Sequence, residues 1–297
     1  LPIKADNVTK EDEPEFKNLW IHVKDDLPKK GLRTAKGQYD LSSPNLPKKL
    51  QEALESLYGS YENYYKVYEE RKKVEKDAMP PVMIVVCNNT TVSELVYRWI
   101  AGFQFEAKGK IKTIKGHLDI FRNEDGVSML DKPNTLIIDS VQIEKEDKID
   151  ANFKEIFKDE IAEFHKEYRH RFPGRDEPAD GQLLREVMNT VGKPGKLGEN
   201  IKCVVSVSML TEGWDVNTVT HVLGIRAFST QLLCEQVVGR ALRRVDYNVK
   251  DDGMMVAEYA EVYGVPFNFL KAEGGTTTPQ PPRVIHRVYS VPEREKY

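Results

Sequence analysis

Residues 204–244 read VVSVSMLTEGWDVNTVTHVLGIRAFSTQLLCEQVVGRALRR, and the pattern of these residues predicts the class of fold. Two short runs of apolar, β-branched residues, 201–207 and 219–225, are separated by a polar loop and followed by a helical pattern over 230–244. Apolar strands that alternate with helices are typical of a parallel sheet covered by helices on both faces. The stretch therefore predicts an α/β fold.

The same alternation extends towards the N-terminus. Apolar runs at 82–86 and 135–139 predict two more strands, and residues 92–100 predict a helix between them. A long amphipathic helix is expected over 47–76, where leucines and tyrosines recur at three- and four-residue spacing. We interpret its tyrosine stripe as a packing face rather than a base-stacking surface. The short run 19–23 is expected to form a strand.

A long charged insertion separates the second and third apolar runs. Its apolar residues recur at helical spacing from Phe153 to Tyr168, and a shorter helix is expected at 182–191. Towards the C-terminus the pattern changes to strand-like segments at 254–259 and 284–291.

Composition limits the classes of protein to which the chain can belong. Its 297 residues carry 44 basic and 47 acidic side chains, and a net charge of −3 argues against bulk electrostatic coating of nucleic acid. No apolar run approaches the roughly 18 residues that span a bilayer, so no membrane contact is expected. Cys87, Cys203 and Cys234 are far apart in apolar surroundings, which predicts reduced, buried thiols and a cytoplasmic location. Because the chain begins at Leu1 without a basic-then-apolar leader, we interpret it as a fragment.

The helix expected at 230–244 has a polar side and an apolar side. Residues at i, i+4 and i+7 share the polar side: Gln236, Arg240 and Arg243. The apolar side is expected to hold Cys234, Val238, Ala241 and Leu242. Arginine's planar donors suit phosphate oxygens, and an arginine that reaches a transferring γ-phosphoryl group across an interface is worth roughly 10³–10⁵ in rate. The alternative for this string alone is a solvated helix whose arginines pair with carboxylates.

Two polar segments follow predicted strands. The first is a loop after 201–207 that contains Thr211, Glu212, Gly213, Trp214 and Asp215. Ligands gather at the carboxyl ends of strands in open α/β sheets, so this loop is well placed for one. The second segment follows 82–86 and contains Asn88, Asn89 and Thr90. Its amides and hydroxyl suit phosphate contacts at a helix start, and N-capping by Thr90 or Thr91 is an equal alternative.

The loop TEGWD and the helix QVVGRALR resemble, in order and spacing, the T-x-G-x-D and Q-x-x-G-R-x-x-R motifs of superfamily 2 helicases. The run from LLREVMNTVGK onward resembles more closely the helicase subunit of type III restriction enzymes. The resemblance covers about residues 47–270 and is dense over 183–244. It implies a RecA-like parallel sheet flanked by helices, with a helical N-terminal lead-in and a charged helical insertion.

The resemblance also implies a division of the chain into three parts. Residues 1–78 would form a linker and the long helix, and 79–252 the second RecA-like lobe with an insertion near 144–200. Residues 253–297 would form a strand-rich extension.

The activity implied is that of an ATP-dependent DNA helicase or translocase, which acts on DNA with a methyltransferase subunit as a candidate partner. The chain contains no GxxxxGK[ST] loop and no acidic pair after an apolar strand. ATP and Mg²⁺ would therefore be held mainly by a preceding RecA-like lobe of the same polypeptide. This chain alone is expected to be inactive as an ATPase.

The resemblance assigns roles to single residues. The positions beside the nucleotide are Thr211, Glu212, Gly213 and Asp215. The coupling glutamine is Gln236, and the arginines that reach the γ-phosphate are Arg240 and Arg243. The residues that touch the nucleic-acid backbone are Asn88, Asn89 and Thr90. Two positions depart from the common pattern, because Val237 replaces a frequent arginine and Trp214 replaces a smaller residue.

Two other interpretations stay open. Asp139 ends an apolar run and is followed by Glu146 and Lys148, which faintly resembles the D…ExK metal site of nucleases, although the ExK element here lies in a charge run. The other alternative is a RecA-like scaffold without chemistry, or a nucleic-acid-binding module, because a fold does not fix a function. The arginine stripe argues against a pure scaffold.

Overall fold

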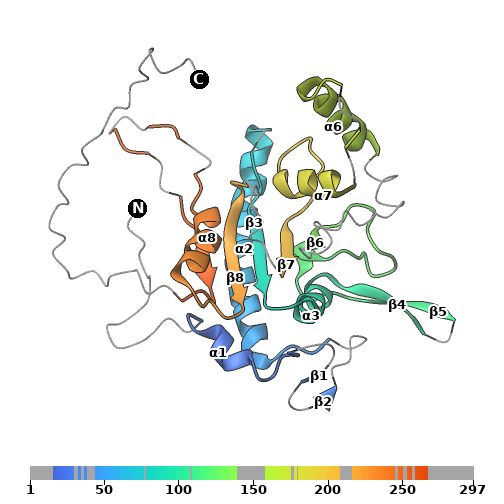
Figure 1. The fold of residues 1–297 in the computed structure, drawn as a ribbon, viewed down its shortest axis with the longest axis vertical. Coiled ribbons are helices and arrows are strands. Elements are labelled where there is room, and N and C mark those ends of the chain that lie inside the picture. Colours follow the sequence, from blue (N-terminus) through green and yellow to red (C-terminus); the bar gives the residue numbers. More distant parts are fainter. Residues whose placement is uncertain are drawn as a thin grey trace, which may run out of the picture. The chain divides into compact units, whose positions relative to one another are not determined.

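A five-stranded parallel sheet forms the centre of the chain in the computed structural model (Figure 1). The strands lie in the order β6-β7-β3-β8-β9, so that β3 is in the middle. Their bounds are β3 Val82–Cys87, β6 Thr135–Ile138, β7 Cys203–Ser206, β8 Val219–Ile225 and β9 Glu261–Tyr263.

The structure describes residues 16–29, 33–34, 37–38, 44–76, 78–107, 109–138, 158–174, 177–178, 180–207, 216–244, 247–249, 253–255 and 258–266. All of them belong to the larger of the two units into which the chain divides, Lys4–Phe267.

β3 is buried on both faces, which explains its unbroken apolar sequence. Alternate residues enter one hydrophobic cluster: Met83, Val85 and Cys87. The residues between them enter a second cluster: Val82, Ile84 and Val86. Ile84 pairs with Val204 of β7 on one side and with Val222 of β8 on the other. Short, β-branched side chains of this kind suit a pleated surface that is covered on both sides.

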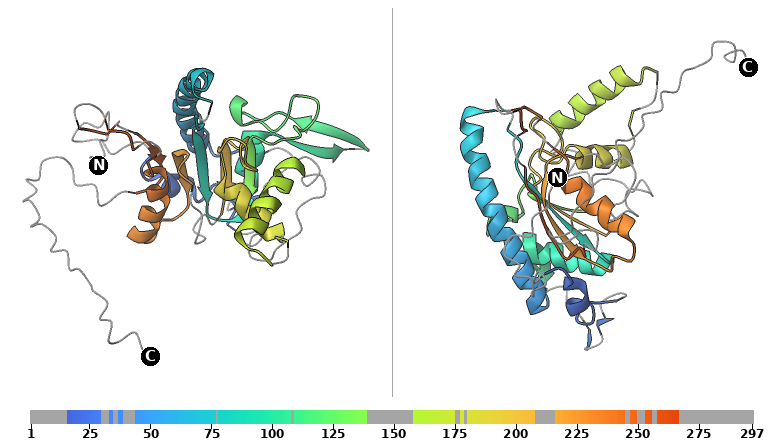
Figure 2. Two further views of the ribbon diagram at one scale, coloured as in Figure 1. Left: turned by 90° about the horizontal axis from the view of Figure 1, so that it is seen from above. Right: turned by 90° about the vertical axis from the view of Figure 1, so that its left-hand side faces the viewer.

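Helices cover both faces of the sheet (Figure 2). One face packs against α1 Leu19–Val23, α2 Lys48–Val74 and α3 Thr90–Ala101. The other face packs against α8 Gln231–Ala241 and against the end of α7 Asp180–Asn189. The predicted fold class is confirmed, because the parallel sheet flanked by helices is consistent with a RecA-like lobe and a helical region precedes it.

Within its described residues, the expected charged insertion includes α6 Lys158–Arg171 and α7. Ile161 and Phe164 of α6 pack against Leu183 and Val187 of α7. Ile161 and Phe164 of the predicted apolar stripe therefore enter a small separate cluster, whereas Phe153 and Phe157 lie outside the described residues.

α2 agrees with the predicted long amphipathic helix. Its buried face repeats every three or four residues: Leu50, Ala53, Leu54, Leu57, Tyr58 and Tyr61. The hydroxyl of Tyr61 donates a hydrogen bond to the carbonyl oxygen of Pro81 at 2.8 Å, just before β3. The interpretation of this stripe as a packing face is confirmed for Tyr61, which is buried against the sheet, whereas Tyr64, Tyr65 and Tyr68 are only partly buried.

A buried histidine lies between α2 and the sheet. His221 in β8 is 0% exposed, its Nδ1 lies 2.7 Å from the Thr220 hydroxyl, and its Nε2 lies 3.3 Å from Ser60 Oγ. The rings of Tyr61 and Tyr64 meet the imidazole edge to face, at centroid distances of 5.4 and 4.9 Å. Burial lowers the pKa of His221 from 6.5 to about 4, so the ring is neutral at physiological pH.

Two predictions of strands were wrong. Residues 19–23 form the helix α1, because Leu19 and Val23 are four residues apart and enter the same cluster as α2. Of the strand expected at 254–259, the described residues form only an isolated bridge of Met255 with Val249, and β9 Glu261–Tyr263 follows beyond this segment. The sheet thus extends past residue 252 into the predicted C-terminal extension. The strand expected at 284–291 lies outside the described residues.

Two hairpins were not predicted. β1 Arg33–Thr34 pairs with β2 Gly37–Gln38, and β4 Phe103–Ala107 pairs with β5 Lys110–Ile114. Among the helices that the structure describes, none is both long enough and apolar enough to cross a membrane.

Candidate functional site

α8 holds the predicted arginine stripe. Thr230 caps its first turn, since the Thr230 hydroxyl accepts a hydrogen bond from the backbone N–H of Leu233 at 3.2 Å. The helix connects two parallel neighbours, β8 and β9, and therefore runs back along the sheet towards the edge at which the strands begin. Arg244 agrees with this direction, because its Nε lies 3.9 Å from the carboxylate of Glu258, which precedes β9.

The two sides of α8 differ in burial largely as predicted. The side against the sheet holds Cys234, Val237, Val238 and Ala241. Gln236 and Arg243 are exposed and Arg240 is half-buried. Leu242 was expected on the apolar side but is 38% exposed, because the helix ends at Ala241 and the chain turns away. Arg243 therefore follows the helix rather than forming part of it.

Val237 explains one departure from the common helicase pattern. This side chain is 2% exposed and belongs to the cluster under the sheet. An arginine at this position would place its charge inside that apolar cluster, at a large desolvation cost. In this chain the position is therefore a packing position.

Arg240 has a distinct electrostatic environment. Burial lowers the pKa of its guanidinium from the usual value, and the group keeps its charge at neutral pH. A guanidinium that is partly dehydrated and carried by a helix loses little further freedom when its planar fork donates to two oxygens of a phosphate. The geometry therefore suits a phosphate contact.

A second set of polar side chains, those of Asn88 and Arg226, lies at the opposite edge of the sheet, where the strands end. Asn88 follows β3, and its Oδ1 is buried without a hydrogen-bond partner among the described residues. Arg226 follows β8, and its Nη1 donates a hydrogen bond to the carbonyl oxygen of Val207 after β7 at 3.4 Å. The Nε of Arg226 is also buried and has no partner in the described part of the chain. Burial lowers the pKa of Arg226, and the nearby Cys87 raises it.

Arg226 was missed by the sequence analysis. The available signal was its position, because it is the first residue after the predicted strand 219–225 and so lies at the edge where ligands gather in open α/β sheets.

Asn89 has a structural role in this edge. Its Oδ1 accepts a hydrogen bond from the backbone N–H of Val92 at 2.9 Å and so caps α3. Its Nδ2 donates to the carbonyl oxygen of Pro28 at 2.8 Å, which ties α3 to the segment after α1. The capping role expected for Thr90 or Thr91 therefore belongs to Asn89. Thr90 itself is exposed.

The predicted site residues thus lie in different places. Asn88, Asn89 and Thr90 lie at the edge where the strands end, and Arg240 and Arg243 lie towards the edge where they begin. The loop with Thr211, Glu212, Gly213, Trp214 and Asp215 lies outside the described residues. Its described neighbour Val207 is at the first of these edges.

No observation supports the nuclease alternative. Asp139, Glu146 and Lys148 lie outside the described residues. Within the described ranges, no group of three or more His, Cys, Asp or Glu side chains could hold a metal ion.

The three cysteines are free and buried, as predicted, and burial raises the pKa of Cys87 and Cys203.

Comparison of the chain with known proteins found no match. No protein-family model, no curated protein and no solved structure matches the chain.

Proposed function

We propose that the chain is the C-terminal motor lobe of an ATP-dependent DNA helicase or translocase, of the kind found in type III restriction-modification enzymes. The observation that carries the proposal is the arrangement of α8. Its apolar side packs on a parallel sheet, and its other side presents Gln236 and Arg240, with Arg243 just beyond the helix end. In this proposal both arginines reach the γ-phosphate of ATP, which a preceding lobe of the same polypeptide holds with Mg²⁺.

Arg240 is better placed than Arg243 to be the principal finger. It lies in the last turn of a helix whose position is set by Val237, Val238 and Ala241, so its backbone is held by the core. Charge stabilisation is most effective when the donor is oriented before the reaction. Arg243, which follows the helix and is exposed, has less support from the core.

Nucleic acid would bind at the other edge of the sheet. Asn88 and Arg226 there have buried polar atoms without described partners, and Thr90 is exposed at the start of α3. A guanidinium, an amide and a helix N-terminus are groups that contact phosphate oxygens in protein–DNA complexes. Asn89 is not included, because capping and the Pro28 contact engage its side chain.

The test is DNA-stimulated ATP hydrolysis by a longer protein that includes the preceding lobe. We expect Arg240→Ala to lower kcat by about 10³-fold or more, because an arginine finger contributes roughly 10³–10⁵ in rate. Arg240→Lys should restore little, since an ammonium group lacks the planar fork. ATP affinity should change far less than kcat.

The matched control is Arg185→Ala, which removes an exposed arginine from α7. This variant should retain the full rate. A wild-type protein that hydrolyses no ATP with any nucleic acid would favour the scaffold alternative, and an Arg240→Ala variant with full activity would exclude the finger.

A further inference from the structure

The β4–β5 hairpin stands apart from the central sheet. Its strands form a separate two-stranded sheet, in which Phe103 pairs with Ile114 and Phe105 pairs with Lys112. Figure 1 and the left view of Figure 2 both show the hairpin extending away from the strands of the central sheet. Neither α8 nor the edge with Asn88 includes any of these residues.

The hairpin is strongly basic within an acidic chain. Residues 103–115 read FQFEAKGKIKTIK and contain four lysines and one glutamate, whereas the whole chain has a net charge of −3. Lys110, Lys112 and Lys115 are exposed. Such a local excess of positive charge attracts polyanions even when the protein as a whole does not.

The register gathers aromatic and basic side chains on one face. Phe105 pairs with Lys112, and alternation along the strands places Phe103 and Lys110 on the same side. The rings of Phe103 and Phe105 have centroids 5.9 Å apart, and Phe105 remains partly exposed. The Arg98 guanidinium of α3 lies 4.7 Å from the centre of the Phe103 ring and pairs with Glu94 at 2.6 Å, which fixes the Phe103 end of this face.

The opposite face of the hairpin is different in character. It carries Glu106 and Ile111, together with Gln104, whose Nε2 donates a hydrogen bond to Thr113 Oγ1 at 3.0 Å. Thr113 Oγ1 in turn donates to the carbonyl oxygen of Val127 at 2.8 Å. The acidic side chain and the loop contact therefore lie away from the Phe105 face.

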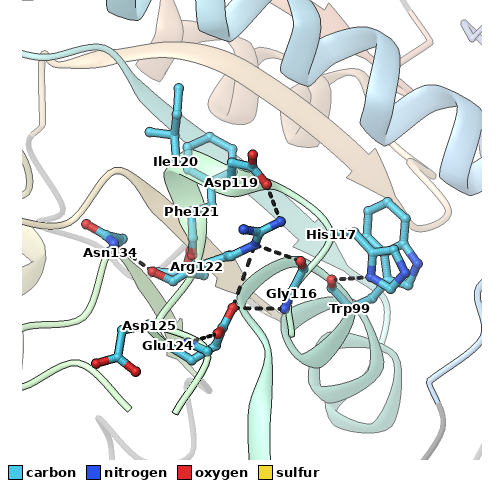
Figure 3. Close-up of polar contacts among 12 residues, drawn as sticks. Trp99, Gly116, His117, Asp119, Ile120, Phe121, Arg122, Glu124, Asp125 and Asn134 are labelled. Atoms are coloured by element: carbon cyan, nitrogen blue, oxygen red, sulfur yellow. Dashed lines mark hydrogen bonds and ion pairs between the residues drawn. The ribbon is translucent and has the colours of Figure 1, made fainter. Parts of the chain in front are cut away.

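The base of the hairpin is held by Gly102, Gly116 and the buried carboxylate of Glu124. Figure 3 shows the contacts of Gly116 and Glu124. Glu124, 5% exposed, accepts a hydrogen bond from the backbone N–H of Gly116 at 3.3 Å. The Nε of Arg122 donates to the carbonyl oxygen of Gly116 at 2.8 Å and lies 3.6 Å from Glu124. A Cβ on Gly102 would lie 2.6 Å from the carbonyl oxygen of Ile114, so the strands can meet there only with glycine.

We propose that the Phe105 face of this hairpin binds single-stranded nucleic acid. Lys110 and Lys112 contact backbone phosphates, and an unpaired base stacks on Phe105. Single strands are favoured over duplex because an aromatic side chain stacks only on bases whose faces are free. A hairpin that merely used lysines to prevent edge-to-edge association would need no partly exposed aromatic residue beside them.

The test is binding of a fluorescent single-stranded oligonucleotide to the 297-residue chain, without ATP and over a range of salt concentrations. Phe105→Ala and Phe105→Leu should weaken binding about 5- to 150-fold, the range expected from one stacked base. Phe105→Tyr should bind normally, which separates stacking from loss of hairpin structure. Changing Lys110 and Lys112 to Gln should lower the slope of log K against log salt by about 1.4.

The control changes Lys66 and Lys76 of the α2 region to Gln, which removes the same charge from exposed positions elsewhere. Its salt slope should equal that of the wild type. The affinities for DNA and RNA oligonucleotides of equal length are compared. Tighter binding of either one supports the proposal and shows whether the preferred single strand is DNA or RNA. Three results would overturn the proposal. They are binding of blunt duplex as tight as that of the single strand, displacement of the oligonucleotide by poly-glutamate as effective as by unlabelled single strand, and an unchanged affinity of Phe105→Leu.

This proposal does not depend on ATP hydrolysis. If Arg240→Ala leaves the motor activity intact but the Phe105 variants lose the single strand, only the function proposed for α8 is overturned. The reverse result overturns only the hairpin surface.

Discussion

At the level of single residues, burial decides which polar groups serve the fold and which are available for ligands. Asn89 caps α3 and contacts Pro28, whereas Asn88 beside it has a buried oxygen without a described partner. Sequence alone placed a cap in this segment but assigned it to Thr90 or Thr91, because three adjacent residues can all accept a hydrogen bond from a helix N-terminus. The choice depends on where α1 lies, which the local sequence does not contain.

His221 gives a prediction on pH. Burial lowers its pKa from 6.5 to about 4, so between these values the unfolded chain binds a proton that the folded chain does not. The neutral ring therefore contributes its stability in full above about pH 6.5, and this contribution is lost as the pH falls to about 4. The loss amounts to about 3 kcal/mol.

The measurement is the free energy of unfolding in urea at several pH values. His221→Gln should have a lower stability at pH 7 but a flatter dependence between pH 6.5 and pH 4 than the wild type. His170→Gln, which removes an exposed histidine from α6, is the matched control variant. If the free energy of unfolding depends on pH equally in the wild type and in His221→Gln, then His221 is not the source of that dependence.

At the level of elements, the sequence identified those that bury a continuous apolar face. β3, β8 and α2 were found close to their observed bounds, because β-branched runs and three-four spacing are direct consequences of burial. The β4–β5 hairpin was missed, because most of its side chains are exposed and it adds no apolar run. α1 was mistaken for a strand, because five apolar or aromatic residues in a row suit either structure when the packing partner is unknown.

The hairpin base gives a matched pair of glycine substitutions. Gly102 and Gly109 both have positive φ, of 77° and 72°, so alanine is strained at either position. Only at Gly102 would a Cβ meet other atoms, at 2.6 Å from Ile114 O and 2.8 Å from Gly116 N. Gly109→Ala should therefore cost about 1 kcal/mol, and Gly102→Ala should cost at least about 2 kcal/mol more. Urea unfolding of both variants tests this order, and equal costs would contradict the close approach.

For the molecule as a whole, the sequence predicted the class of sheet but not the order of its strands. β6 is the next parallel strand after β3 in the chain, yet β7 lies between them. Short apolar runs of similar composition fit any of the inner positions, so their order is decided by the connections and helices. The fifth strand, β9, was predicted a few residues too early in the chain, because a strand of three residues gives little periodic signal.

The centre of the sheet should determine global stability. Ile84 is 2% exposed and lies between β7 and β8, so Ile84→Ala should lower the free energy of unfolding by about 2–5 kcal/mol. Ile111→Ala removes the same atoms from a side chain that is 72% exposed and should change it by less than about 0.5 kcal/mol. Chemical denaturation followed by circular dichroism measures both, and a small effect at Ile84 would contradict the position of the core.

The connection between β6 and β7 has a consequence for how the protein folds and for how it tolerates change. These neighbours in the sheet end at Ile138 and begin at Cys203, so the ladder between them closes over a long stretch of chain. Contacts of such large sequence separation slow folding, because the ordering entropy is lost before the contact forms. The equilibrium cost grows only with the logarithm of length, and doubling the stretch would add about 0.6 kcal/mol. Additional sequence between these strands would therefore delay the native state far more than it would destabilise it.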